Sequence, residues 1–81
     1  MSSLQKTYKR GEVIYKEGDK ITHVIFVQSG GVQQTLLRNK KNIELMSIGS
    51  NNVLGEAGLA GIPTHNIAAV ATQETKTLEV P

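Results

Sequence analysis

Apolar residues in this chain come in short runs, and none repeats with the 3.6-residue period of a long helix. The runs are rich in β-branched residues, which favour a pleated, half-buried surface. Turn residues separate the runs at intervals of about eight to twelve positions, a spacing typical of a β-sandwich or barrel. The pattern predicts an all-β chain. The predicted strands are 12–16, 23–28, 31–37, 43–48, 67–72 and 75–80.

The segment 38–48 predicts two local features. Residues 39–42 read Asn-Lys-Lys-Asn between two strand-like runs, and Asn tolerates positive φ, so a hairpin tip is expected there. In 43–48 the alternation of apolar and polar residues is imperfect. Ile43 and Leu45 are expected to face inward together with Met46 or Ile48, and a β-bulge would settle the phase.

One short helix is expected at 56–60, because glycines frame this segment at positions 55 and 61. Closing the short strands into a double-sheet jelly roll or a small barrel removes exposed sheet edges. Tyr15 and Phe26 are expected in the core, where aromatic side chains bury a large area. His23 is expected to begin a strand and to be partly exposed.

Size and composition exclude several classes of protein. Eighty-one residues are expected to form one domain, residues 1–81. The chain has no cysteine, so disulfides and thiolate metal sites are excluded. The longest apolar run, 67–71, is far shorter than the roughly 20 residues of a membrane span. The N-terminal residues lack the apolar region of a secretory signal. We therefore expect a cytoplasmic protein without membrane insertion.

The basic residues do not predict a nucleic-acid interface. The formal net charge is only +2, and the densest basic pairs, at 9–10 and 40–41, lie at predicted turns. Neither pair is interleaved with the aromatic residues of a nucleic-acid platform. These pairs are interpreted as solvated surface.

Three segments in order resemble the cyclic-nucleotide-binding domain family. Residues 8–19 contain a Gly-Glu-x-Ile run that leads to a Gly-Asp turn, and residues 24–32 contain an apolar strand, a Ser-Gly turn and a return strand. Residues 49–71 resemble the family's phosphate-binding cassette, with Gly55-Glu56-Ala57-Gly58 and, nine residues after Glu56, His65-Asn66. The resemblance implies a β-roll that holds one cyclic nucleotide, either cAMP or cGMP, with no cofactor and no metal.

The resemblance also implies roles for individual residues. Glu56 would accept a hydrogen bond from the ribose 2′-hydroxyl, worth about 1.5–3 kcal/mol. Its alternative is a helix first-turn residue, worth about 0.3–1 kcal/mol. The backbone of Gly55, Ala57 and Gly58 would bind the phosphate at the start of the short helix. These small residues could equally serve only a tight turn.

Histidine at position 65 departs from the family, which places an arginine there. An arginine grips phosphate oxygens with a charged, planar fork, whereas a histidine offers one donor and is mostly neutral at pH 7. Replacing the charged fork of an arginine by a single neutral donor is expected to cost about 2–4 kcal/mol of binding free energy, or roughly 30- to 1000-fold in affinity for the nucleotide. Asn66 can supply a neutral donor, and protonation of His65 below about pH 6.5 would restore some charge. The alternative is an exposed loop histidine.

These observations leave two functions open. The first is a regulatory sensor module for a cyclic nucleotide, most readily cAMP, that acts on an effector domain or a homodimer partner. The family's helices normally follow the roll, so a chain that stops at Pro81 is expected to lack this lid, as a fragment or as a natural minimal version. The second is a ligand-free roll that serves as an interaction or dimerisation module.

An enzyme is not expected. A metal-dependent β-barrel enzyme usually needs several histidines and a carboxylate around one ion. This chain has only His23 and His65, and it has no recognisable nucleophile–base arrangement.

Overall fold

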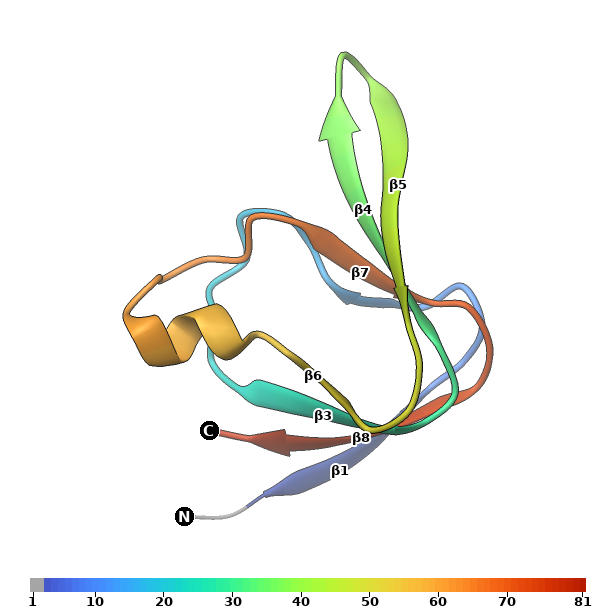
Figure 1. The fold of residues 1–81 in the computed structure, drawn as a ribbon, viewed down its shortest axis with the longest axis vertical. Coiled ribbons are helices and arrows are strands. Elements are labelled where there is room, and N and C mark those ends of the chain that lie inside the picture. The colour runs from blue at the N-terminus through green and yellow to red at the C-terminus, as the bar shows by residue number, and fades with distance from the viewer. Residues whose placement is uncertain (1–2) are drawn as a thin grey trace.

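The computed structural model describes residues 3–81 and folds into two packed β-sheets (Figure 1). The first two residues of the predicted domain 1–81 lie outside the described residues. Each sheet has four antiparallel strands, so the predicted all-β, double-sheet roll is confirmed. One sheet contains, in spatial order, β1 (Leu4–Tyr8), β8 (Thr75–Val80), β3 (Val24–Ser29) and β6 (Asn52–Leu54). The other contains β2 (Val13–Tyr15), β7 (Ala68–Ala71), β4 (Val32–Arg38) and β5 (Lys41–Ile48).

All six predicted strands are present, and two further strands, β1 and β6, were not predicted. In β1 only Tyr8 is buried, so this strand has no apolar alternation to reveal it. Strand β6 is only three residues long and follows a turn directly. Both strands form because a neighbour pairs with them: β1 with β8, and β6 with β3.

The β4–β5 hairpin turns more tightly than expected. Asn39 and Lys40 have positive φ angles of 51° and 64°, and β5 begins at Lys41. The predicted hairpin tip is confirmed, although it takes two residues rather than four. Two successive residues with positive φ are typical of a type I′ turn, whose twist matches that of the flanking strands.

Strand β5 contains the predicted bulge, but its apolar side chains are not covered. Between the pairs Gln33–Ser47 and Thr35–Glu44, β5 has one residue more than β4. Register places Ile43 opposite Leu36. Ile43 and Leu45 are nevertheless 44% and 49% exposed, and Met46 is 61% exposed. The expectation that Ile43 and Leu45 pack inward was wrong, because this part of the hairpin extends beyond the strands of the other sheet (Figure 1). Of the two alternatives for the third inward residue, Ile48 packs against the core and Met46 does not.

The core lies between the two sheets and is small. In β3, Ile25 and Val27 face inward, so Phe26 faces outward and is 41% exposed. The prediction that Phe26 packs in the core was wrong, whereas the burial of Tyr15 is confirmed. His23 precedes β3 and is half-buried, as predicted. The core cluster comprises Tyr15, Ile25, Val27, Val32, Leu54 and Ala69.

Strands β1 and β8 bring the two ends of the chain together. Leu4 pairs with Glu79, and the strands β1 and β8 lie side by side in Figure 1. The buried Glu79 carboxylate accepts hydrogen bonds from the Tyr8 hydroxyl at 2.6 Å and the Thr77 hydroxyl at 3.1 Å. Lys6 Nζ lies 3.6 Å from the other carboxylate oxygen. Burial and the bond to Glu79 raise the pKa of Tyr8, so its hydroxyl keeps its proton as a donor.

The predicted short helix is present as η1 (Glu56–Ala60), a 3₁₀ helix between β6 and β7. It lies at one end of the roll (Figure 1). Gly55 and Gly61 frame it with φ angles of 75° and 86°. Within residues 3–81, no helix has the length and apolar character needed to cross a membrane.

Candidate ligand-binding site

The loop from Gly55 to Asn66 is held against the β2–β3 loop by backbone hydrogen bonds. The Ile21 N–H donates to the Pro63 carbonyl at 2.9 Å, and the His65 N–H donates to the Asp19 carbonyl at 2.8 Å. The Gly18 N–H donates in turn to the His65 carbonyl at 2.7 Å. This ladder fixes where the side chain of His65 enters the roll.

Two glycines of the loop are required by close packing. Gly55 has positive φ, and a Cβ atom there would lie 2.9 Å from the His23 carbonyl oxygen. A Cβ atom at Gly58 would lie 2.7 Å from Cγ2 of Ile21. The packing of the loop therefore accounts for both glycines without a ligand, which is the alternative considered from the sequence.

His65 is buried and stacked on Tyr15. The two ring centroids are 3.6 Å apart with an interplanar angle of 13°, and His65 is 8% exposed. The interpretation of His65 as an exposed loop residue was therefore wrong. Burial lowers the pKa of the imidazole below its ordinary 6.5, although the Asp19 carboxylate acts in the opposite direction. The side chain is neutral at pH 7, and charging it requires more acid than the sequence alone suggested.

A cavity of about 160 Å³ opens beside this stack, and we call it the cassette cavity. Five of the six residues predicted for the site line it. The sixth, Gly58, lines a neighbouring cavity against Ile21. Glu56 and Asn66 are exposed at the cassette cavity. The predicted residues that line it are Gly55, Glu56, Ala57, His65 and Asn66.

Several lining residues were not predicted from the sequence. Gln34 comes from β4 and Tyr15 from the end of β2, both far along the chain from the loop. Gln34 shares the inward phase of Val32, so a polar residue at an inward position was the available signal. The remaining lining residues are Ile21, Val53, Leu54, Thr64 and Ile67.

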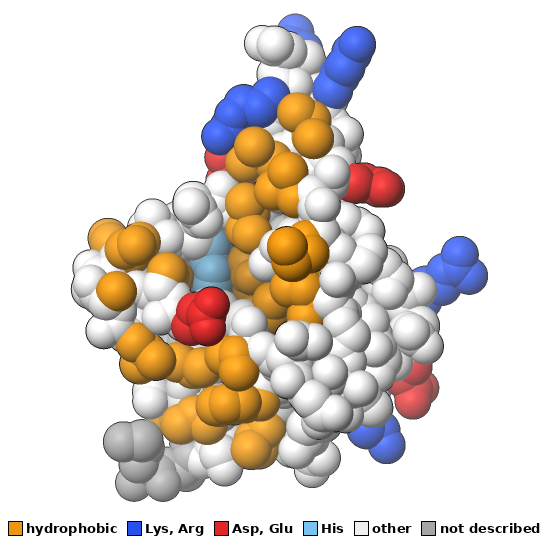
Figure 2. Space-filling view, viewed as in Figure 1, with side chains coloured by type: hydrophobic (Ala, Val, Ile, Leu, Met, Phe, Trp, Pro, Cys, Tyr) orange, Lys and Arg blue, Asp and Glu red, His pale blue; other side chains and the backbone are white. Residues whose placement is uncertain are grey.

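Figure 2 shows the face that carries this cavity. A histidine lies in a hollow between two groups of apolar side chains, and an acidic side chain lies close to it. One group follows the β4–β5 hairpin. The apolar walls would contact a flat or hydrophobic part of a ligand, while the polar groups of the cassette cavity would orient it.

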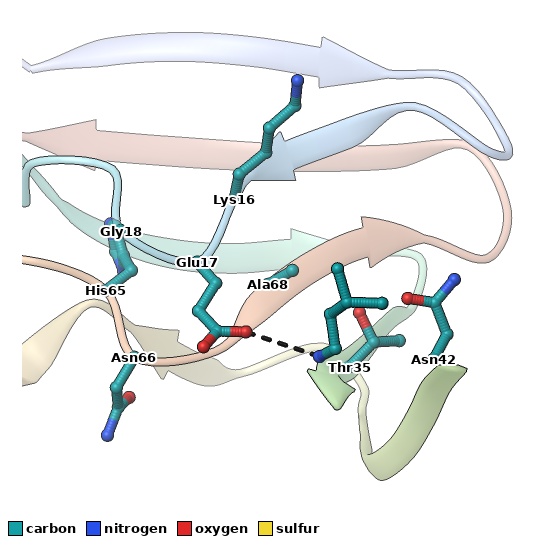
Figure 3. A pocket seen from close by; sticks show the side chains of 9 residues that line it. Lys16, Glu17, Gly18, Thr35, Asn42, His65, Asn66 and Ala68 are labelled. Carbon is teal, nitrogen blue, oxygen red and sulfur yellow. Dashed lines mark hydrogen bonds between the residues drawn. The ribbon is translucent and has the colours of Figure 1, made fainter. Parts of the chain in front are cut away.

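A larger cavity of about 630 Å³ lies on the other side of His65 and Asn66 (Figure 3). It is bounded by Lys16, Glu17 and Gly18 and by Thr35, Leu37, Asn42 and Ala68 of the β4, β5 and β7 strands. The Glu17 carboxylate here already accepts hydrogen bonds from Arg38 at 3.0 Å and from the Leu37 N–H at 3.4 Å. Those bonds lower the pKa of Glu17. Glu56 does not line this cavity, so size alone does not identify the ligand site.

No group of three or more His, Cys, Asp or Glu side chains suited to a metal ion occurs among residues 3–81. A model of the cyclic nucleotide-binding domain family matches residues 5–81. The chain belongs to this family. The family assignment made from the sequence is thus confirmed, over almost the whole chain. The comparison with curated proteins gave no match.

Solved structures share the fold of this cyclic nucleotide-binding domain. The catabolite activator protein of Thermus thermophilus is 24% identical with a TM-score of 0.88, over 96% of this chain and 37% of that protein. The sensor domain of the regulator DNR from Pseudomonas aeruginosa is 18% identical with a TM-score of 0.88, over 98% of this chain and 54% of the other. The cAMP-bound form of the EAL enzyme Bd1971 is 21% identical with a TM-score of 0.88, over 95% of this chain and 21% of that enzyme.

This cyclic nucleotide-binding domain spans roughly a fifth to a half of the solved chains named above. At these identities the likeness establishes the fold of the roll alone.

Proposed function

We propose that this domain is the sensor module of a regulatory protein and that the cassette cavity binds a cyclic nucleotide, cAMP first and cGMP as the alternative. The observation that carries the proposal is the convergence of five predicted site residues on one cavity. Family membership supports it. The cAMP-bound state of a protein with the same fold adds to this support. The lack of cysteine fits a cytoplasmic setting.

In this proposal Glu56 orients the ribose. Its carboxylate is exposed at the cavity and accepts the 2′-hydroxyl proton in a hydrogen bond. The backbone of Gly55 and Ala57, with Gly58 behind it, lies where the phosphate would approach. Asn66 and the edge of the buried His65 ring form the phosphate rim.

The site is expected to bind weakly. His65 is neutral and its ring face is covered by Tyr15, so it cannot replace a charged fork. The cavity of about 160 Å³ is also smaller than the roughly 300 Å³ lower range of ligand pockets, so part of a nucleotide would project from it. A sensor further needs an output element whose equilibrium the ligand shifts. That element, as an effector domain or a second copy, is part of the proposal.

Calorimetric titration of the 81-residue chain with cAMP and then cGMP tests the proposal. We expect saturable binding that Glu56→Ala weakens about 10- to 100-fold, because a hydrogen bond to a charged acceptor is lost. His65→Arg is expected to tighten binding by a similar factor. Because burial lowers the pKa of His65, binding should strengthen only as the pH falls through that lowered pKa and the ring gains charge, which titrations at a series of decreasing pH values measure.

The matched control is Glu44→Ala, which removes an exposed carboxylate from β5 and lines none of the cavities described above. Its affinity should equal that of the unchanged chain. If neither nucleotide binds the unchanged chain or His65→Arg, the sensor proposal fails. The ligand-free interaction module would then be the better account of this fold.

A further inference from the structure

The charge of the cassette cavity is unusual for a site that receives a phosphate. Among its described lining residues, only Glu56 carries a charge at pH 7. The other polar side chains there are neutral: Tyr15, Gln34, Thr64, His65 and Asn66. No lysine or arginine is part of this described lining. The cavity is therefore acidic.

A cyclic nucleotide carries one permanent negative charge on its phosphodiester. Proteins usually meet such a charge with the paired donors of an arginine or with a lysine. Here the nearest lining charge has the same sign, and like charges at short range repel. The carboxylate that accepts the ribose hydroxyl thus opposes the phosphate of the same ligand.

Neither His65 nor the helix removes this conflict. The His65 ring lies flat on Tyr15 and is 8% exposed, so it is held as a neutral, packed side chain. The helix η1 has only five residues, so it lacks the aligned turns that build a macrodipole. A Cβ atom added at Gly58 would lie 2.7 Å from Cγ2 of Ile21, so Gly58 faces the β2–β3 loop.

Ribose without the phosphate fits Glu56 better. A free nucleoside presents both its 2′- and 3′-hydroxyls as donors, whereas the 3′-oxygen of a 3′,5′-cyclic nucleotide is esterified. A carboxylate has two acceptor oxygens and can receive both hydroxyls of the cis diol. The small cavity volume of about 160 Å³ also favours the smaller ligand.

From this geometry we infer that the cassette cavity binds uncharged ribonucleosides at least as tightly as the corresponding cyclic nucleotides. Glu56 receives the cis diol, and the apolar wall around Val53, Leu54 and Ile67 contacts the uncharged remainder of the ligand. The inference rests on the proposed function, because it takes the same cavity as the ligand site. It changes the ligand class that the sensor responds to.

Competitive titration of the 81-residue chain with adenosine, 2′-deoxyadenosine and cAMP tests this inference. At about pH 7.5, the dissociation constant of adenosine should equal or fall below that of cAMP. Binding of 2′-deoxyadenosine should be about 10-fold weaker or more, because one hydrogen bond to Glu56 is lost. Added salt should leave adenosine binding unchanged and should strengthen cAMP binding, because it screens the repulsion.

Two substitutions at the cavity and one control test the role of charge. Asn66→Lys adds a cation at the exposed rim and should move the preference toward cAMP by about 10-fold or more. Ser50→Lys adds the same charge on an exposed turn that lines none of the cavities described, and the preference should stay unchanged. Glu56→Gln keeps an acceptor but removes the charge, so it should weaken adenosine binding more than cAMP binding, because for cAMP the lost hydrogen-bond strength is offset by the lost repulsion.

The outcomes distinguish this inference from the proposed function. If cAMP binds measurably more tightly than adenosine to the unchanged chain, the inference is wrong and the cyclic-nucleotide sensor stands. If adenosine binds and cAMP does not, the inference holds and the cyclic nucleotide is replaced as the ligand. If neither ligand binds, both are wrong.

Discussion

The stack of His65 on Tyr15 shows how packing decides the chemical role of a side chain. An arginine at this place would extend a charge toward a ligand, whereas the histidine ring is packed between the β2–β3 loop and the core. His65 therefore has two roles, because it lines the cassette cavity and also packs on Tyr15. Its side chain acts as a neutral aromatic surface of the cavity and not as a charged group.

This packing predicts how stability depends on pH. The pKa of His65 is lowered in the folded state, so the unfolded chain binds a proton more readily. The contribution of neutral His65 to the free energy of unfolding is fully present above about pH 6.5, the ordinary pKa of histidine. It is lost as the pH falls through the lowered folded-state pKa. Urea unfolding between about pH 7.5 and pH 5 should show a larger loss of stability in the unchanged chain than in His65→Phe.

The phenylalanine variant keeps an aromatic ring for the stack but has no proton to gain. His23→Gln provides the control for removing a histidine elsewhere in the chain. Equal pH dependence in the unchanged chain and His65→Phe would contradict the assignment of this titration to His65.

At the scale of elements, the sequence correctly predicted those strands, turns and helices whose formation depends on neighbouring residues. The six short apolar runs, the hairpin tip at Asn39 and the helix between Gly55 and Gly61 each depend on a few neighbouring residues. Strand β1 could not be predicted, because its hydrogen bonds come from β8 at the other end of the chain. The exposure of Phe26 and Ile43 likewise depends on which sheet faces them.

In the candidate site, too, the residues close in sequence were predicted and those brought in by distant strands were not. Gly55, Glu56, Ala57, His65 and Asn66 are close in sequence, and the resemblance to the family's cassette predicted that they belong to one site. Gln34 and Tyr15 reach the cavity through pairing of β4 and β2 with β7, which the sequence does not state. The burial of His65 depends on Tyr15 and was missed for this reason.

The turn from β3 to β4 offers a test of packing between elements. Gly30 has a φ of +97°, and a Cβ atom there would clash with the Glu74 carbonyl oxygen and lie 2.6 Å from Thr75 Cα. Gly11 also has positive φ, at +87°, but a Cβ atom there would meet nothing within 4 Å. Gly11→Ala should cost about 1–2 kcal/mol from backbone strain alone.

Gly30→Ala should cost at least twice as much as Gly11→Ala, because backbone atoms must move as well. Urea midpoints, compared at an unchanged m value, measure both losses. Similar losses in the two variants would mean that the start of β8 shifts easily, contrary to this expectation.

At the scale of the whole molecule, one buried carboxylate joins the two ends of the chain. Glu79 on β8 accepts the Tyr8 hydroxyl of β1 at 2.6 Å and is 4% exposed. In an 81-residue chain with a small core, each such contact is a large part of the marginal stability. Tyr8→Phe should therefore lower the free energy of unfolding by about 1.5–3 kcal/mol.

Thr7→Val is the matched control, since it alters an exposed hydroxyl of the same strand and should change stability by about 0.5 kcal/mol or less. Thermal and urea unfolding of both variants measure the difference. A Tyr8→Phe variant as stable as Thr7→Val would show that Thr77 and Lys6 satisfy Glu79 without Tyr8.

The antiparallel pairing of β1 with β8 has a further consequence. Because Leu4 lies opposite Glu79, the polypeptide enters and leaves the roll at neighbouring points, about one strand spacing of roughly 4.8 Å apart. A host protein could carry this roll as an insertion within one of its surface loops, with little separation between the two junctions. Motion of the roll would then reach the host through a single hinge point rather than through two distant ones.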